Sequence, residues 1–376
     1  MFKQKQWLAV IKGNHWVVAK VARHKSKLDI LHLLEFRAGS ENEFQSVQDQ
    51  LGEDLRLQKE DLKEEKQSNA VGKTDLLKEW LNKNRIPVNK LRIAVSCQGV
   101  ITRMITLPLM STQDLDRLLT EQVDQYFTLN ILDYVVDYRV LEHFKEDGEM
   151  RLRVLLAALP KYQWKKLWSE WEEIGFKPKV VDLAADGLAR LYSQLTLKGK
   201  NQTNIAELGT PLDLAIVDLS AERVEFILLE QGVFFLFSDL EVSLNELDQV
   251  AITVHAQGLD HGQAEEGEDS QLQTAKLNAW AKKEIEMTLG SVLQSLSEFF
   301  SFFAARHFGK SIDRIYITGD YVNLPYLQEI FENNLEITTQ IGFPNAWSPC
   351  FSKKMSIHQK NGMKYGSLYG LALREG

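Results

Sequence analysis

The sequence lacks the features that mark several common protein classes. Only two of its 376 residues are cysteine, Cys97 and Cys350, and they do not form a CxxC pair. A disulfide framework is therefore not expected. We expect instead that the protein is located in the reducing environment of the cytosol. No run approaches the roughly 18 consecutive apolar residues of a membrane-spanning helix. The N-terminal apolar run is too short for a secretory signal peptide.

Basic residues are also in the minority. The chain has 44 Lys and Arg against 52 Asp and Glu, which gives a net charge of −8. Nucleic acid is therefore not expected as the main partner, because phosphate binding requires a basic face. Hydrophobic residues make up 44% and charged residues 26%, which indicates a folded globular protein. The length favours two domains or one elaborated domain.

The common nucleotide and hydrolase motifs are missing. There is no GxGxxG and no GxSxG. Gly72-Lys73-Thr74 and Gly309-Lys310-Ser311 resemble the end of a phosphate-binding loop, but the glycine required upstream is replaced by Gln67 or Ala304. We therefore interpret both segments as ordinary loop residues, because the motif needs its full context to bind phosphate.

No metal or catalytic cluster stands out either. His255 and His261 flank Asp260, but they lie in a segment rich in Gly, Gln and Glu. Ligand types without fixed geometry are weak evidence, so we expect no metal there. No nucleophile and base are recognisable, and we assign no catalytic residue.

The chain begins with a pattern of three strands, which we expect at Trp7–Ile11, Trp16–Ala22 and Leu28–Phe36. A highly charged segment, Leu51–Asn69, is interpreted as a solvated helix or flexible insertion. The pattern then favours a helix at Leu76–Lys83. Two further strands are expected at Leu91–Cys97 and Val100–Leu107.

The middle of the chain mixes helix and strand patterns. Ser111-Thr112-Gln113-Asp114 is a capping box that predicts a helix start. Pro160 begins a helix whose tryptophan stripe we assign to the core, and Gly175 ends it. The remaining expected elements are strands at Tyr134–Leu141, Arg151–Leu159 and Lys177–Leu183 and a helix at Ala184–Gln194.

The opening pattern recurs about 200 residues later. After a polar candidate linker, Leu195–Leu208, three strands are expected again at Leu214–Asp218, Val224–Glu230 and Val233–Glu241. The repetition predicts two related domains. Asp260–Ser270 reads as an acidic surface loop. The elements expected after it are a long helix through Ile285–Phe303, a strand at Ile315–Thr318, a helix at Leu324–Asn333 and a final helix of small residues, Tyr365–Arg374.

Four stretches of this pattern resemble the PilM family of actin-like type IV pilus assembly proteins. They are Leu8–Val21, Ile101–Leu141, Leu214–Gly232 and Arg314–Phe331, together with the closing YGLALR. The segment Ile101–Leu141 is the most specific, with Leu-Pro, Met-Ser, a helix and then an Asp-Tyr strand. The similarity is weak but covers most of the chain.

The resemblance implies an α/β chain with the actin-like ATPase fold, in which two ribonuclease-H-like domains carry an inserted subdomain in the first. We expect the first domain at residues 1–107 and 180–205, the inserted subdomain at 108–179 and the second domain at 206–376.

The family's nucleotide loops are altered in this sequence. An actin-type ATPase needs an acid in each phosphate loop for the Mg²⁺ shell and glycines for close approach to phosphate. Ile11 replaces the first acid, Asp218 keeps the second, and Ser220 replaces its glycine. In the adenosine loop Gly319 is followed by Asp320 and Tyr321 in place of glycines, and the Tyr321 ring could fill the adenine slot.

The candidate nucleotide-binding residues are therefore Lys12, Gly13, Asp218 and Gly319. Lys12 could compensate for the lost acid by pairing with a phosphate. An alternative is that Asp218 and Gly319 are strand-end residues kept by the fold, since a fold does not fix a function. No cofactor is expected to be required, and binding of ATP with Mg²⁺ stays open.

The resemblance implies a non-catalytic scaffold at the inner face of the cytoplasmic membrane, attached through partners. It would dock the cytoplasmic N-terminal tail of a PilN-type single-span protein between the first domain and the inserted subdomain. The helix Thr112–Phe127, with Asp116, Glu121 and Gln125 on its outer face, is the candidate docking surface. Contacts with other pilus inner-membrane components and self-association are further expectations.

Three alternatives stay open. The first is a true ATPase of the same machine. The second is an FtsA-like division anchor, although such proteins end in an amphipathic membrane helix and this sequence is expected to stop at Arg374-Glu375-Gly376, right after its final domain helix. The third is the cytoplasmic part of a GspL-type secretion protein, which would need a membrane span.

Overall fold

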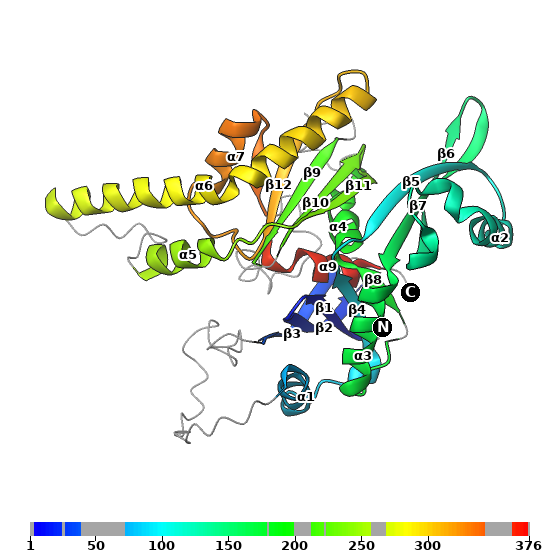
Figure 1. The fold of residues 1–376 in the computed structure, drawn as a ribbon, viewed down its shortest axis with the longest axis horizontal. Coiled ribbons are helices and arrows are strands. Elements are labelled where there is room, and N and C mark those ends of the chain that lie inside the picture. The colour runs from blue at the N-terminus through cyan, green and yellow to red at the C-terminus, as the bar shows by residue number, and fades with distance from the viewer. Residues whose placement is uncertain are drawn as a thin grey trace.

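A computed structural model describes the chain in eight ranges. They are residues 4–24, 27–38, 72–178, 180–198, 212–221, 223–256, 268–342 and 363–374. Within them the strands form three sheets, two of five strands and one of three (Figure 1).

The first sheet has the order β3-β2-β1-β4-β8. Its strands are β1 (Gln4–Lys12), β2 (His15–His24), β3 (Lys27–Arg37), β4 (Leu91–Ser96) and β8 (Val181–Leu183). The first three are antiparallel neighbours, whereas β4 runs parallel to β1 and β8 parallel to β4. Gly13 turns the chain between β1 and β2 with a positive φ of 55°, a conformation that glycine adopts without strain.

The second sheet repeats this arrangement in the order β11-β10-β9-β12-β13. Its strands are β9 (Leu214–Ser220), β10 (Arg223–Glu230), β11 (Val233–Leu240), β12 (Arg314–Gly319) and β13 (Thr339–Ile341). Again three antiparallel strands are followed by two parallel ones. The prediction of two equivalent three-strand units in separate sheets is therefore confirmed.

The third sheet is small and has the order β5-β7-β6. It contains β5 (Ile101–Pro108), β6 (Tyr134–Glu146) and β7 (Glu149–Pro160), and α2 (Thr112–Gln122) packs on it through Leu115 and Leu119. Ser111 is the N-cap of α2 as predicted, because its hydroxyl accepts a hydrogen bond from the Asp114 amide at 3.2 Å. This sheet continues neither of the others. Its first strand, β5, begins at Ile101, before the expected start of the inserted subdomain at residue 108. The exact domain boundaries stay a prediction.

Helices cover and join the sheets. They are α1 (Lys73–Lys83), α3 (Lys161–Glu173), α4 (Ala184–Lys198), α5 (Glu246–Ala256), α6 (Glu268–Arg306), α7 (Leu327–Leu335) and α9 (Gly366–Leu373). Short 3-10 turns lie at Val88–Lys90, Val123–Tyr126, Ile131–Asp133 and Met363–Tyr365. None of the helices in the described ranges is long and apolar enough to cross a membrane.

Helices α4 and α9 lie between the two large sheets (Figure 1). Their buried side chains, among them Leu188, Tyr192 and Leu371, belong to one hydrophobic cluster that includes residues of both sheets. A second cluster lies between the second sheet and α5, α6 and α7. The pair α4 and α9 therefore fixes how the two large sheets face each other.

Several expected elements differ in extent. The long helix begins at Glu268, well before the apolar pattern is clear, and α5 was not predicted because its stretch lacks a strong periodicity. The strand expected at Lys177–Leu183 is formed only by Val181–Leu183. Lys73 and Thr74 were expected in a loop but form the first turn of α1. Lys310 and Ser311 lie in a loop as expected.

Some expectations concern residues outside the described ranges. They are the charged segment Leu51–Asn69, Asp260 and His261 with most of the acidic segment, and residues 199–208 of the candidate linker.

Candidate functional site

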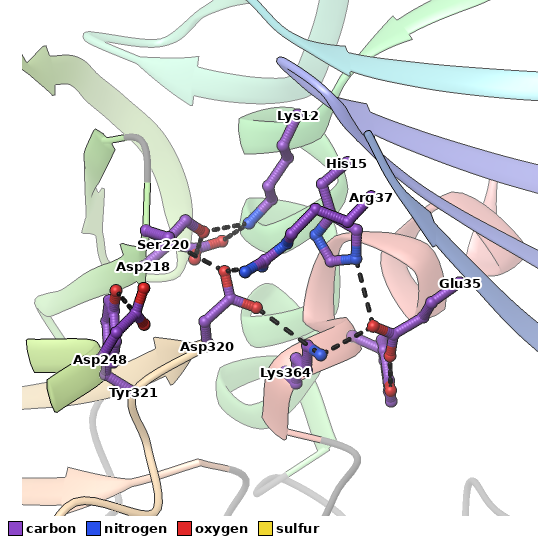
Figure 2. Close-up of polar contacts among 12 residues, drawn as sticks. Lys12, His15, Glu35, Arg37, Asp218, Ser220, Asp248, Asp320, Tyr321 and Lys364 are labelled. Carbon is purple, nitrogen blue, oxygen red and sulfur yellow. Dashed lines mark hydrogen bonds and ion pairs between the residues drawn. The ribbon is translucent and has the colours of Figure 1, made fainter. Parts of the chain in front are cut away.

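The candidate site lies in the cleft between the two large sheets, at the carboxyl ends of their central strands. Lys12 ends β1, Asp218 and Ser220 end β9, and Asp320 follows β12 (Figure 2). A cavity of about 480 Å³ opens beside them. Its lining comes from both sheets and from α5: Lys12, His15, Arg37, Ala38, Ser220, Ala221, Arg223, Asn245, Asp248 and Asp320.

Lys12 crosses this cleft and contacts the second sheet. Its Nζ lies 2.5 Å from Asp218 Oδ2 and donates to Ser220 Oγ at 3.0 Å. Ser220 in turn donates to Asp218 Oδ1 at 2.8 Å. The side chains of Lys12 and Asp218 are only 14% and 3% exposed. Burial alone would lower the pKa of Lys12, but the carboxylates of Asp218 and Glu225 outweigh it and raise that pKa, so the ammonium stays charged.

Glu225 lies beside Asp218, its register partner on the neighbouring strand. Ser96 Oγ donates to Glu225 Oε1 at 2.6 Å, and Oε2 has no hydrogen-bond partner in the described part of the chain. Burial raises the pKa of Glu225, Lys12 lowers it, and the nearby Asp218 raises it further, with a net rise. The cleft therefore holds two neighbouring acidic groups whose charge Lys12 offsets.

Asp320 forms a second connection across the cleft. Its carboxylate lies 3.3 Å from Arg37 Nη2 and 3.9 Å from Lys364 Nζ, and it accepts the backbone N–H of Ala221 at 3.3 Å. Burial would raise the pKa of Asp320, but the positive charges of Lys364, His15 and Arg37 lower it. The carboxylate is thus an anchor for cations from the first sheet and from the segment before α9.

Glu35 gathers the remaining polar groups. It lies 3.2 Å from His15 Nε2 and 2.8 Å from Lys364 Nζ, and it accepts the hydroxyl of Tyr365. Burial would raise the pKa of Glu35, but the hydrogen bond of His15 and the charge of Lys364 hold it well below its usual range. Figure 2 shows that this cluster shares Lys364 with Asp320, so the polar contacts continue from the cleft to the segment before α9.

The structure brings three of the four predicted nucleotide-binding residues together. Lys12 and Asp218 are in direct contact, and Gly319 packs against Asp218, since a Cβ at Gly319 would lie 2.6 Å from Asp218 Oδ1. Gly319 has φ +108°, so the fold itself requires glycine there. Gly13 lies in the turn next to Lys12. A nucleotide role for these four residues stays a prediction.

Ile11 needs a correction. The sequence was interpreted as placing Ile11 where the first loop carries its acid, but the Ile11 side chain is 3% exposed and belongs to the core. Side chains alternate along a strand, and it is the next residue, Lys12, whose side chain lines the cleft. An acid at position 11 would therefore enter the core.

Tyr321 does not point into open space. Its ring is buried in the second hydrophobic cluster, and its hydroxyl lies 2.9 Å from Asp248 Oδ1. Asp248 belongs to α5, an element that was not predicted, so this contact could not be foreseen. Whether the ring occupies an adenine slot stays a prediction.

The cleft does not fit a Mg²⁺ ion as arranged. Both oxygens of Asp218 are engaged by Lys12 and Ser220, and a lysine ammonium has no lone pair for a metal. Throughout the described ranges, no three His, Cys, Asp or Glu side chains gather in a way that could hold a metal. Lys12, Arg37 and Arg223 line the cavity as cations and could face an anion.

A second cavity of about 430 Å³ lies between the small sheet, the first sheet and α3. Apolar walls come from Leu155, Ala157 and Leu159 of β7 and from Trp164 and Trp168 of α3. These three β7 residues alternate along the strand, so their side chains lie on one face of the small sheet, and that face lines the cavity. We call this cavity the groove.

Two strands present their edges to the groove. Tyr138 lines it together with both its neighbours, Asp137 and Arg139, and β8 contributes all of Val181–Leu183. Consecutive side chains point to opposite faces, so such a run indicates a strand edge. In the described ranges, β6 pairs only with β7 and β8 only with β4, which leaves both edges facing the groove open.

Ion pairs join the walls of the groove. Arg139 of β6 contacts Asp186 in the first turn of α4, and Asp186 also contacts Arg190. Arg190 Nη1 donates to the carbonyl of Gly370 in α9 at 3.1 Å. This network connects the small sheet with the two helices between the large sheets.

The expected docking face on α2 is not part of the groove. Asp116, Glu121 and Gln125 are exposed as expected, but none of them lines this cavity. Asp116 instead accepts the hydroxyl of Tyr138 at 2.5 Å. The groove residues on β6, β8 and α3 were not singled out, because strand edges and an aromatic stripe look like ordinary core in sequence.

Comparisons with known proteins agree with this architecture. A profile of the family described as Type IV pilus assembly protein PilM matches residues 33–376. No curated protein matches the chain. Among solved structures, the chain is similar to a PilM–PilN type IV pilus biogenesis complex, with a TM-score of 0.64, 17% sequence identity and 99% of each chain covered.

Two more distant structures are similar to this chain. One is the cytoplasmic domain of EpsL, an inner-membrane component of the Vibrio cholerae type II secretion system, with a TM-score of 0.39 and 7% identity over 99% of this chain and 96% of that one. The other is ADP-bound MreB5 of Spiroplasma citri, with a TM-score of 0.39 and 10% identity over 96% of this chain and 98% of that one. The expected actin-like fold is confirmed by the similarity to the PilM–PilN structure over 99% of each chain.

Proposed function

The chain belongs to the PilM family of type IV pilus assembly proteins, and from this premise we propose that it is a non-catalytic actin-like scaffold of such a machine. It docks the cytoplasmic N-terminal tail of a PilN-type single-span membrane protein. The tail lies in the groove between the first sheet and the small sheet. The similarity to a solved PilM–PilN complex supports this choice of partner.

The open strand edges at the groove carry the proposal. A peptide in extended conformation gains main-chain hydrogen bonds from a strand edge and specificity from side-chain pockets. Here the edges of β6 and β8 face the groove, and Leu155, Trp164 and Trp168 offer apolar contacts. A short tail would thereby have both kinds of contact within one cavity.

The tail also sets the location. A partner whose span crosses the cytoplasmic membrane would hold the scaffold at the inner face of that membrane without a span in the scaffold itself. Other inner-membrane pilus components and further copies of the chain are proposed to assemble on it there.

Calorimetry with a synthetic peptide tests the docking. The peptide carries the cytoplasmic N-terminal residues of a PilN-type protein from the same organism. Val135→Lys puts a charge at a groove position that is 38% exposed, and it should weaken binding at least about tenfold, or 1.4 kcal/mol. Met150→Lys is the matched control, because Met150 is 45% exposed on the same sheet but outside the groove. Equal affinity of both variants would contradict the proposal.

A second candidate is an active ATPase of the same machine. The cavity of about 480 Å³ between the two sheets, lined by Lys12, Arg37 and Arg223, favours it. The occupied Asp218 carboxylate argues against it. A hydrolysis assay separates the two candidates and is described in the Discussion.

A further inference from the structure

The centre of the cleft suggests a role for Lys12 that goes beyond docking. We propose that Lys12 is a built-in cation, which takes the place of a divalent metal between the two large sheets. Its ammonium both pairs with the Asp218 carboxylate of the second sheet and joins that sheet to the first. The contact between the two sheets at this point is then a property of the chain alone and requires no bound metal.

The charge arrangement supports this role. Asp218 is 2% exposed and Glu225 is likewise 2% exposed, and the two face each other as register partners on β9 and β10. A buried carboxylate without a cation is costly, and Asp218 lies beside a second buried carboxyl group. Lys12 provides this cation, since its Nζ lies 2.5 Å from Asp218 Oδ2.

The geometry explains why the cation comes from the chain. Lys12 ends β1 of the first sheet, and its partner ends β9 of the second, 206 positions later. A bound Mg²⁺ would need several oxygen ligands in octahedral positions. Here the Lys12 ammonium approaches Asp218 Oδ2 and Ser220 Oγ, and Ser220 holds Oδ1, so the same oxygens are used without a metal.

Mn²⁺ is the probe, since it binds oxygen ligands and is followed directly by its paramagnetic spectrum. The Lys12→Ala variant leaves Asp218, Glu225 and Ser220 around an empty space. We expect this variant to bind one Mn²⁺ at least about tenfold more tightly than the unmodified chain. Mn²⁺ should also raise its thermal unfolding midpoint, whereas the midpoint of the unmodified chain should not respond. Thermal unfolding thus gives a readout that is independent of any enzymatic activity.

Two further variants complete the experiment. Lys12→Ala with Asp218→Asn should lose the Mn²⁺ response, because one carboxylate is neutral. Lys20→Ala is the matched control, a lysine of β2 whose ammonium lies 5.3 Å from the Trp7 ring centroid. It should behave like the unmodified chain.

The opposite results would overturn the proposal. An Mn²⁺ response of the unmodified chain that Asp218→Asn removes would mean that the cleft holds a metal beside Lys12. A folded Lys12→Ala variant with no Mn²⁺ response would mean that Lys12 is an ordinary ion pair. If Lys12→Ala folds only with Mn²⁺, the proposal is supported. If Lys12→Ala folds neither with nor without Mn²⁺, the proposal requires that Lys12→Ala with Asp218→Asn is more stable than Lys12→Ala alone. A double variant that is no more stable overturns the proposal.

Discussion

Gly187 of α4 and Gly370 of α9 touch backbone to backbone between the two large sheets. A Cβ atom built on Gly370 would lie 2.8 Å from the Cα of Gly187 and closer still to its carbonyl group. A Cβ on Gly187 would lie 2.7 Å from the carbonyl oxygen of Ser367. The two helices can therefore cross at this distance only because both residues are glycine. The crossing positions the cleft and the groove, since both depend on α4 and α9.

The first prediction concerns this crossing. Gly370→Ala should lower the free energy of unfolding by more than about 4 kcal/mol, because backbone atoms must move apart to admit the methyl group. Denaturant unfolding measures the change. Gly290→Ala is the control, because nothing lies within 4 Å of a Cβ there and Gly290 is an exposed position of α6. It should raise the stability by about 0.5–1 kcal/mol. Equal effects of the two substitutions would contradict the close crossing.

The second prediction is a pH dependence at Glu35. Its pKa is held well below the usual range, with the hydrogen bond of His15 and the charge of Lys364 opposing the effect of burial. A carboxylate with a lowered folded-state pKa stabilises the fold above its unfolded pKa of about 4.3, and this contribution is lost as the pH falls further. The unfolding free energy should thus decline below about pH 4.3, and less steeply in Glu35→Gln. Parallel pH curves for the two proteins would exclude this role.

Local patterns were enough to predict much of the fold. The successive apolar runs at the start of each half predicted both three-strand units, and the Ser111 capping pattern predicted the start of α2. Each signal is contained within a few neighbouring residues. The helix α5 and the early start of α6 were missed because periodicity is weak there, and their position depends on packing against the second sheet.

The site was predicted only in part, for a physical reason. Lys12 and Asp218 were named separately, but their contact joins positions 206 apart and depends on how the sheets face each other. Glu35 and Lys364 are 329 positions apart and were not singled out at all. Near the end of β3, Glu35 and Arg37 are charged residues two positions apart. This alternation is a local signal that one face of the strand end is polar. No local pattern reveals which charges meet across a cleft.

The third prediction concerns the connection between the groove and α4. Arg139→Met removes a partner of the buried Asp186 carboxylate, which keeps Arg190. Because the Arg139 side chain is 38% exposed, solvent screens the ion pair, and the free energy of unfolding should fall by only about 1 kcal/mol. Arg117→Met serves as the control, because Arg117 is 70% exposed and pairs with Asp114 within α2. Thermal unfolding compares them, and a larger effect at Arg117 would contradict the prediction.

The fourth prediction follows from the correction at Ile11. Ile11→Asp should lower the stability by more than about 3 kcal/mol, because the carboxyl group would enter the core between Trp16 and Val95. It should not create a nucleotide site. Ile11→Val, which keeps an apolar side chain, should cost about 0.5–1.5 kcal/mol. If Ile11→Asp folds with normal stability and gains Mg²⁺-dependent nucleotide binding, the assignment of Ile11 to the core is wrong.

The last prediction decides between the scaffold and the ATPase. Phosphoryl transfer depends on positive charge that offsets the phosphates and on an ordered attacking water, which an actin-like site arranges through acids around Mg²⁺. In this cleft the Asp218 carboxylate is engaged by Lys12 and Ser220, and position 11 offers no acid. A phosphate-release assay with ATP and Mg²⁺ should therefore show no turnover above the protein-free blank. A binding titration beside it should show, at most, weak binding that Lys12→Ala changes more than removal of Mg²⁺ does. Steady turnover that disappears in a folded Asp218→Ala variant would overturn the scaffold proposal, because it would assign hydrolysis to this cleft.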